Sequence, residues 1–421
     1  MAVKLRLLTR LGALASVAGI AAFVLLAPAA VPQGGPHPLG ARAAPMLASD
    51  APEALLVATL NAIGRNQLDI ATAEIDRVLA RYPNFRLAHL IKGDLLMARA
   101  RPISNLGAAQ NMPADRIADL REEARARLAR YAQERPADRV PRYLLQMAPE
   151  QKYAMVVDTA RSTLFVFENV NGEPKLVADY YVTSGKNGPD KKRSGDKRTP
   201  LGVYHVTGSL PRARLDVLYG KAAELYGVGA LPINYPNEWD KREGREGNGI
   251  WLHGVPYDTY SRPPRASDGC VALTNQDFEA IAKQVQVGST PVIISSTVEW
   301  VASDTMRKTR GDFMGRFEQW RQDWESLDTG RYLAHYAPGF AAGSQNLDQW
   351  SQQKRTVNAA KSWVKVKASG VSAFLYPGRE DLAVVTFEQD YASSNLSNKM
   401  RKRQYWLNEG GAWKIIYEGA A

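Results

Sequence analysis

The sequence predicts a multidomain α+β protein, because three successive parts of the chain have different periodicities. Residues 49–148 repeat apolar side chains at helical spacing, residues 151–297 alternate them as strands do, and residues 303–421 place helices before strands. A length of 421 residues suits two or three domains. With 45% hydrophobic and 23% charged residues, the composition is that of a globular protein.

The first 30 residues have the pattern of an export segment. Three basic residues lie among the first ten, and residues 11–31 carry no charge. We expect residues 1–30 to be a signal peptide or an N-terminal anchor, and the Pro/Gly/Ala-rich residues 31–48 to be a linker. The sequence therefore predicts an exported protein of the periplasm or cell envelope, which meets the membrane only through this segment.

The balance of charge is strongly basic. A net charge of +11 favours anionic partners such as cell-wall polymers. The export segment argues against nucleic acid as the partner. The densest basic run, residues 186–198, also carries Asp190 and Asp196 and lacks aromatic residues. We expect it to be a solvated loop.

Residues 49–148 are predicted to form helical hairpins. One apolar stripe is expected from Leu55, Leu56, Ala58, Leu60 and Ile63. A second stripe is expected from Ile70, Ala73, Ile75, Val78 and Leu79. Residues 67–97 resemble a single tetratricopeptide-type hairpin, and such arrays normally need several units. We expect a packing or protein-docking module.

Residues 151–297 are predicted to form a β-rich sandwich. Strands are expected at 153–159, 162–167 and 175–182, with a hairpin turn at Asn171-Gly172. Further strands are expected at 204–206, 249–252 and 291–295, and a helix at 277–284. The stretch 211–249 reads as a long loop beside the site. Its Tyr235 and Trp239 could bind substrate or simply pack the loop down.

Residues 303–421 are predicted to form a cone-shaped α+β domain. Phe313, Phe317, Trp320 and Trp324 recur at helical spacing, and five strands are expected between residues 364 and 417. This order resembles the nuclear-transport-factor-like, ketosteroid-isomerase-like fold. We expect the aromatic stripe to be core and the domain to be accessory, serving dimerisation or cell-wall docking.

The candidate chemistry lies in residues 251–277. Cys270 is the only cysteine, and His253 stands seventeen positions before it. A neighbouring imidazole is the usual means of generating a reactive thiolate near neutral pH. Ser267, Asp268 and Gly269 form a tight turn before the cysteine, whose N–H groups can face an oxyanion. The alternative for Cys270 is a small buried hydrophobic residue.

These residues carry a family resemblance. His253-Gly254, followed after fourteen positions by Ser267-Asp268-Gly269-Cys270, resembles the signature of L,D-transpeptidase catalytic domains. Residues 197–204, with Thr199-Pro200 and Gly202, resemble a second motif of that family.

The resemblance implies a function. Cys270 is the implied nucleophile, His253 the base and the Gly254 carbonyl the group that orients the imidazole. Peptidoglycan stem peptides are the implied substrate, with wall-anchored or cell-envelope protein as a further partner class. We expect no cofactor and no metal.

The sequence departs from the family pattern at two places. Asp268 stands where histidine is common, and Ala272 stands where arginine is frequent. A carboxylate beside the thiol disfavours the thiolate unless Arg265 or His253 compensates. Arg265 and Asp268 are also candidates for contact with substrate.

Three hypotheses therefore remain. They are an L,D-transpeptidase, a hydrolase on the same fold that trims stem peptides or detaches wall-anchored protein, and a catalytically silent cell-wall scaffold.

Overall fold

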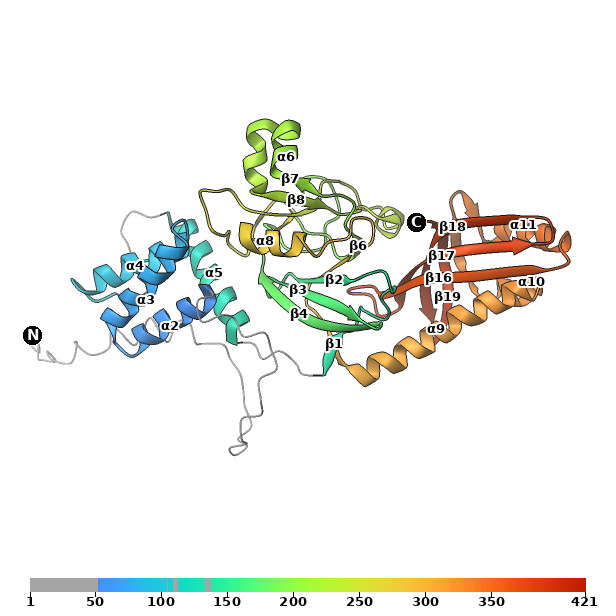
Figure 1. Ribbon diagram of the computed structural model, residues 1–421, viewed down its shortest axis with the longest axis horizontal. Coiled ribbons are helices and arrows are strands. Elements are labelled where there is room, and N and C mark those ends of the chain that lie inside the picture. The colour runs from blue at the N-terminus through green and yellow to red at the C-terminus, as the bar shows by residue number, and fades with distance from the viewer. Residues whose placement is uncertain (1–51, 104, 109–112, 133–137) are drawn as a thin grey trace, which may run out of the picture. The chain divides into compact units, whose positions relative to one another are not determined.

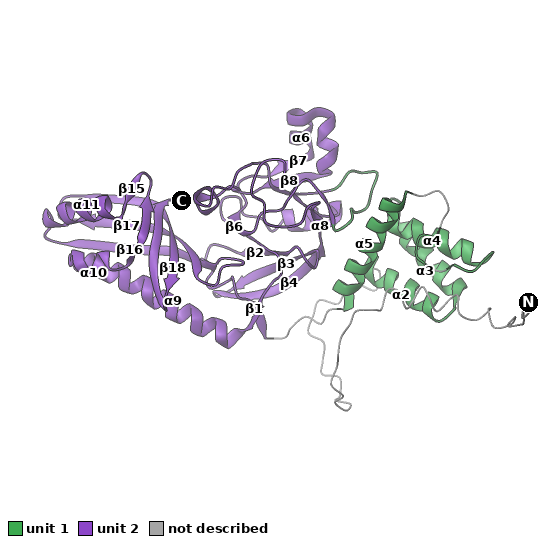
Figure 2. Ribbon diagram, turned by 180° about the vertical axis from the view of Figure 1, so that it is seen from behind, with its two compact units in different colours: residues 1–135, 255–264 green, residues 136–254, 265–421 purple. Residues whose placement is uncertain are grey.

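The computed structural model describes residues 52–103, 105–108, 113–132 and 138–421. The chain divides into two compact units, residues 1–135 with 255–264, and residues 136–254 with 265–421 (Figure 2). The predicted export segment and linker lie outside the described residues. Within the described ranges, no helix combines the length and apolar character needed to cross a membrane.

The described residues of the smaller unit include four helices around one core. They are α2 (Pro52–Gly64), α3 (Leu68–Arg81), α4 (Arg86–Ala98) and α5 (Ala114–Ala132). Leu55, Leu56 and Ile63 are buried as predicted, and Ala58 and Leu60 of the same stripe are half-buried. On α3 the buried stripe is Ala71, Ile75 and Val78. The expected stripe was wrong at its first members, since Ile70 is 51% exposed and Ala73 is exposed. Positions 71, 75 and 78 lie on one face of the helix, and positions 70 and 73 lie outside that face.

The helical unit ends earlier than residue 148. Residues 136–148 belong to the larger unit, where Tyr143 and Leu145 are at most 1% exposed. Strand β1 (Arg139–Pro141) pairs with β13 (Trp300–Ala302) in antiparallel fashion. Residues 255–264, expected in the β-rich domain, belong to the smaller unit instead. Contacts with residues distant in sequence decide to which unit residues 136–148 and 255–264 belong. Local periodicity carries no information about such contacts.

The β-rich part of the larger unit contains a five-stranded sheet in the order β4-β3-β2-β12-β6. Its strands are β2 (Tyr153–Asp158), β3 (Thr163–Val170), β4 (Glu173–Tyr181), β6 (Gly202–His205) and β12 (Pro291–Ser295). Asn171 and Gly172 join β3 to β4 with φ of 55° and 87°. Two positive φ angles are what a two-residue hairpin turn requires.

A second sheet, in the order β11-β9-β8-β7, packs against the first. Its strands are β7 (Leu210–Pro211), β8 (Gly229–Pro232), β9 (Trp251–His253) and β11 (Val271–Ala272). Strands β5 (Ser184–Gly185) and β10 (Arg265–Ser267) form a separate two-stranded parallel sheet. Val157 and Ile294 of the first sheet share one core with Leu231, Leu252 and Val271 of the second.

The stretch 211–249 is not the structureless loop that we expected. It contains α6 (Arg212–Tyr219), the 3-10 helix η1 (Gly220–Tyr226), β8 and α7 (Glu238–Arg242). Short helices with few apolar positions leave little periodic signal, so their sequence resembles a loop. Helix α8 (Asn275–Ala282) follows β11 close to its predicted place.

The C-terminal part places helices against a six-stranded sheet in the order β15-β14-β19-β18-β17-β16 (Figure 1). The helices are α9 (Ser303–Glu325), α10 (Thr329–Leu333) and α11 (Leu347–Ala359). The strands are β14 (Tyr336–Ala342), β15 (Gln345–Asn346), β16 (Val364–Leu375), β17 (Leu382–Ser393), β18 (Ser397–Glu409) and β19 (Ala412–Ala420). The predicted multidomain α+β class is thus confirmed.

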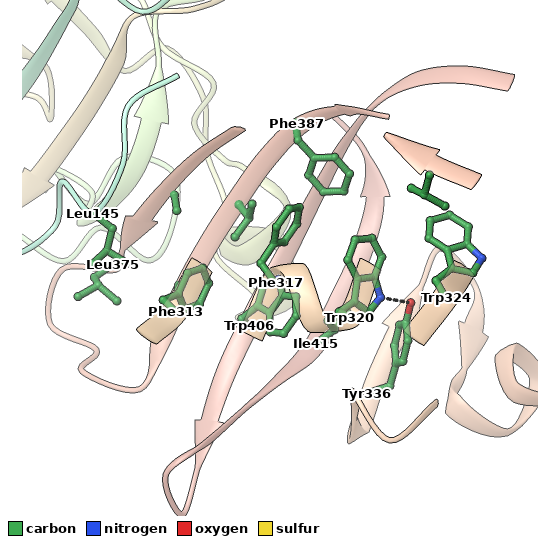
Figure 3. Close-up of a cluster of buried hydrophobic side chains, with 14 of the residues drawn as sticks. Leu145, Phe313, Phe317, Trp320, Trp324, Tyr336, Leu375, Phe387, Trp406 and Ile415 are labelled. Atoms are coloured by element: carbon green, nitrogen blue, oxygen red, sulfur yellow. Dashed lines mark hydrogen bonds between the residues drawn. The ribbon is translucent and has the colours of Figure 1, made fainter. Parts of the chain in front are cut away.

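The aromatic stripe of α9 is core. Phe313, Phe317, Trp320 and Trp324 are at most 5% exposed and face the sheet (Figure 3). The Trp320 indole N–H donates to the Tyr336 hydroxyl at 3.3 Å.

Candidate active site

His253 is the last residue of β9 and only 3% exposed. Its Nδ1 lies 2.6 Å from the Gly254 carbonyl oxygen. A carbonyl oxygen only accepts hydrogen bonds, so Nδ1 carries the ring proton and Nε2 keeps its lone pair. The imidazole is therefore held as the tautomer that can take up a proton through Nε2.

Cys270 directly precedes β11, which pairs in parallel with β9. Ala272 lies opposite His253, and the Leu273 N–H donates to the His253 carbonyl at 2.9 Å. Cys270 therefore lies two residues before Ala272, the residue that β11 places opposite His253. The Cys270 Sγ lies 3.3 Å from the Gly249 carbonyl oxygen, and the residue is partly exposed. The thiol is not sealed in the core.

Aromatic side chains flank the two residues. The Tyr226 ring stands edge-on to the His253 ring at a centroid distance of 5.2 Å and packs against Trp251 at 4.9 Å. Burial, together with the negative charge of the Cys270 thiolate, raises the pKa of Tyr226. The Tyr226 hydroxyl therefore stays protonated at neutral pH. Sequence reasoning missed Tyr226, since it ends a short 3-10 helix that carries no motif.

The turn before Cys270 is fixed by Ser267. The Ser267 hydroxyl donates to the Cys270 carbonyl at 2.6 Å and accepts from the Gly269 N–H at 3.1 Å. Gly269 has φ of +129°, and a Cβ there would meet the Arg198 carbonyl oxygen at 2.7 Å. Only glycine fits this position. The Gly269 N–H is engaged within the turn, so it holds the turn together.

Thr199, in the second family-like motif, ties this turn to a neighbouring segment. Its hydroxyl is buried, donates to the Gly269 carbonyl at 3.0 Å and accepts from the Gly185 N–H at 2.8 Å. The sequence marked the motif but not this role.

The basic run before Thr199 is folded and not simply solvated. The carboxylate of Asp196 accepts from the Lys191 ammonium at 2.8 Å and from the N–H groups of Lys192, Arg193 and Arg198. Burial alone would raise the pKa of Asp196, but these donors lower it well below its usual range. One carboxylate thus organises the loop that carries the site's basic side chains.

The charged neighbours of Cys270 are exposed. The Asp268 side chain is 85% exposed and lies 3.7 Å from the Lys197 ammonium. Lys197 is thus a cation that offsets the carboxylate, in a role that we expected of Arg265 or His253. Arg265 lies on β10 opposite Ser184 and is exposed. Solvent screens charges in such positions.

Tyr235 and Trp239, for which we expected either contact with substrate or packing of the loop, are both buried. Tyr235 is 5% exposed and its hydroxyl donates to the Glu246 carbonyl at 2.8 Å. Trp239 is 7% exposed and stacks on Tyr405 of the C-terminal sheet at 5.5 Å. His205, the other histidine of this part, lies on β6, where burial lowers its pKa to about 4.

The described residues contain no group of three or more His, Cys, Asp or Glu side chains arranged to hold a metal ion.

Comparison with known proteins bears on this geometry. Residues 152–294 match the family model of the L,D-transpeptidase catalytic domain, and residues 312–419 match that of the Cds6 C-terminal NTF2-like domain. The structure of Bd1075 from Bdellovibrio bacteriovorus is 31% identical with a TM-score of 0.59, and the similarity covers 68% of this chain and 98% of Bd1075. The chain belongs to the L,D-transpeptidase family. The resemblance stated from the two motifs is confirmed.

Two further relatives of this L,D-transpeptidase family member are known. The putative L,D-transpeptidase YafK of Escherichia coli is 26% identical over 193 residues, which are 45% of this chain and 68% of YafK. Pgp2, a helical cell shape determining protein from Campylobacter jejuni, has a TM-score of 0.55 and 24% identity over 66% of this chain and 95% of its own. The Pgp2 comparison concerns the fold.

Proposed function

We propose that this protein is a cysteine-dependent L,D-transpeptidase that acts on peptidoglycan stem peptides in the cell envelope. The observation that carries the proposal is the contact of His253 Nδ1 with the Gly254 carbonyl, on a strand whose neighbour β11 directly follows the partly exposed Cys270. This contact leaves Nε2 as the ring nitrogen that can accept the thiol proton. The net charge of +11 favours an anionic polymer as substrate.

The proposed reaction begins with proton transfer from Cys270 Sγ to His253 Nε2. The thiolate forms a C–S bond with a stem-peptide carbonyl carbon, and the Cys270 N–H donates to the oxyanion. The C–N bond then breaks as the imidazolium returns its proton to the leaving amine. An acceptor amine attacks the thioester, forms a new amide bond and releases the thiol.

Water in place of the amine would make the same enzyme a hydrolase that trims stem peptides or detaches wall-anchored protein. Arg265 and Asp268, both exposed beside the cysteine turn, are the side chains that we propose for contact with the substrate.

Incubation with purified sacculi, followed by analysis of muropeptides, tests the proposal. We expect new cross-linked dimers from the wild type and a rate at least about 1,000-fold lower for Cys270→Ser. A carbapenem should form an adduct on Cys270 of the wild type alone. Loss of linkages without new dimers would assign the hydrolase, and no Cys270-dependent change would leave the scaffold role.

Export is part of the proposal. Fractionation of cells that express the full chain should find it in the envelope, and removal of residues 1–30 should leave it in the cytoplasm.

A further inference from the structure

Residues 255–264 join the two proposed catalytic residues along the chain. The segment begins two residues after His253 and ends six before Cys270, yet it folds with the helices of the smaller unit (Figure 2). We infer that the helical unit is a positioning device for the active site, and that Tyr260 is the anchor of this segment. The inference rests on the proposed roles of Cys270 and His253.

Tyr260 is seated in an aromatic and cationic pocket of the helical unit. Its ring centroid lies 4.5 Å from that of Tyr82 and 4.8 Å from that of Phe85. The Arg127 guanidinium lies 5.8 Å from the Tyr260 ring and 5.0 Å from the Phe85 ring. Tilted aromatic pairs and cation–π contacts both depend on ring position, so they hold the side chain in one place.

Backbone and hydroxyl contacts hold the residues on either side. The Tyr260 N–H donates to the Asn84 carbonyl at 3.1 Å, and the Asn84 side-chain amide donates to the Tyr257 carbonyl at 2.8 Å. The Ser261 hydroxyl, in a residue only 7% exposed, donates to Glu123 at 2.6 Å. The segment is therefore bound to the helices through its main chain as well as its side chains.

Glu123 belongs to a buried charge cluster. Arg127 is 1% exposed and lies 2.5 Å from Glu53 and 2.9 Å from Glu123. Burial would raise the pKa of Glu53, but the charges of Arg127 and Arg130 lower it, so that this carboxylate stays ionised. Removal of one member leaves the others unpaired in the interior. Ser261 is thus hydrogen-bonded to a buried ion-pair cluster of the helical unit.

The attachment matters because the segment is continuous with both catalytic residues. Ordering a flexible backbone costs conformational entropy, and the contacts with the helices supply this ordering before substrate binds. Without it, the connection between His253 and Cys270 would be a free ten-residue loop.

The test compares Tyr260→Ala with Tyr260→Phe in the full chain. We expect Tyr260→Ala to lower the rate of Cys270 alkylation by iodoacetamide at pH 7 about tenfold and to shift its pH profile. We also expect it to lower kcat about tenfold with KM within twofold. Tyr260→Phe keeps the ring and should match the wild type. Tyr131→Ala, a 41% exposed tyrosine of the same unit, is the control and should also match it.

A folded Tyr260→Ala variant with the wild-type alkylation profile and kcat would overturn the inference. If circular dichroism shows that this variant loses its helices, Ser261→Ala decides in its place. A wild-type profile there would overturn the inference, and a slowed one would support it. Alkylation needs no peptidoglycan. Slowed alkylation of the variant alongside an inactive wild type would therefore refute the proposed function while supporting the positioning role.

Discussion

At the scale of single residues, the buried hydroxyl of Thr199 links the turn before Cys270 to the segment that contains Gly185. The hydroxyl accepts a hydrogen bond from the Gly185 N–H and donates one to the Gly269 carbonyl. Thr199→Val has nearly the same shape but leaves both groups unpaired in the interior. We expect it to lower the free energy of unfolding by about 2–4 kcal/mol and turnover by about tenfold or more. Urea unfolding and the sacculus assay measure the two effects.

Thr199→Ser is the matched control, because it keeps the hydroxyl and removes only a methyl group. It should lose about 1 kcal/mol or less and keep most of the activity. Equal losses in the two variants would show that the methyl group, and not the hydrogen bonds, stabilises the turn.

At the scale of elements, α7 carries a buried carboxylate at its start. The Asn237 side chain accepts from the Asp240 N–H, and the Asp240 side chain accepts from the Asn237 N–H, which forms a capping box. Asp240 is 1% exposed, and burial raises its pKa to about 6. The folded state therefore holds a proton that the unfolded state releases near its ordinary pKa of 3.8.

This raised pKa predicts a pH dependence of stability. Between pH 4 and 6 the folded state binds more protons than the unfolded state, so the contribution of Asp240 falls as the pH rises. We expect a loss of about 2–3 kcal/mol from pH 4 to pH 7. Asp240→Asn keeps an oxygen to accept from Asn237 and cannot ionise, so it should be more stable than the wild type at pH 7.

Urea unfolding at several pH values measures this difference. Asp304→Asn, at a side chain that is 89% exposed, is the control and should leave the pH profile unchanged. A constant difference between Asp240→Asn and the wild type from pH 4 to 7 would contradict the prediction.

At the scale of the whole molecule, the catalytic and C-terminal parts of the larger unit share one core. Phe165 and Trp239 belong to the same buried cluster as Tyr376 and Tyr405. The Asn237 side-chain amide donates to the Tyr376 hydroxyl at 3.0 Å. Two parts joined through a common core should unfold together.

Trp239→Ala tests this coupling. We expect it to lower the free energy of unfolding by about 3–5 kcal/mol in one transition of the larger unit, with KM for stem peptides unchanged. Calorimetry and the sacculus assay measure the two results. Trp363→Ala, at a 45% exposed tryptophan, should have little effect on either. A raised KM without a change in the free energy of unfolding would show that Trp239 contacts the substrate and would contradict the packing role.

Strong local patterns account for what could be predicted. The hairpin at Asn171-Gly172, the aromatic face of α9 and the spacing of His253 and Cys270 all rest on signals within a few turns or strands of chain. The exposed Ile70 shows where such local patterns fail to predict burial, because an apolar side chain at roughly helical spacing need not face the core.

Periodicity and motif spacing are local properties, so they were sufficient to predict the multidomain α+β class, the family and the residues on which the proposed chemistry depends. Local patterns could not predict that Tyr226 flanks His253, that Thr199 holds the cysteine turn, that Trp239 packs on Tyr405, or that residues 255–264 fold with the helices. Each of these depends on contacts between residues far apart in the chain. Their geometry follows from packing and hydrogen-bond satisfaction in the folded molecule.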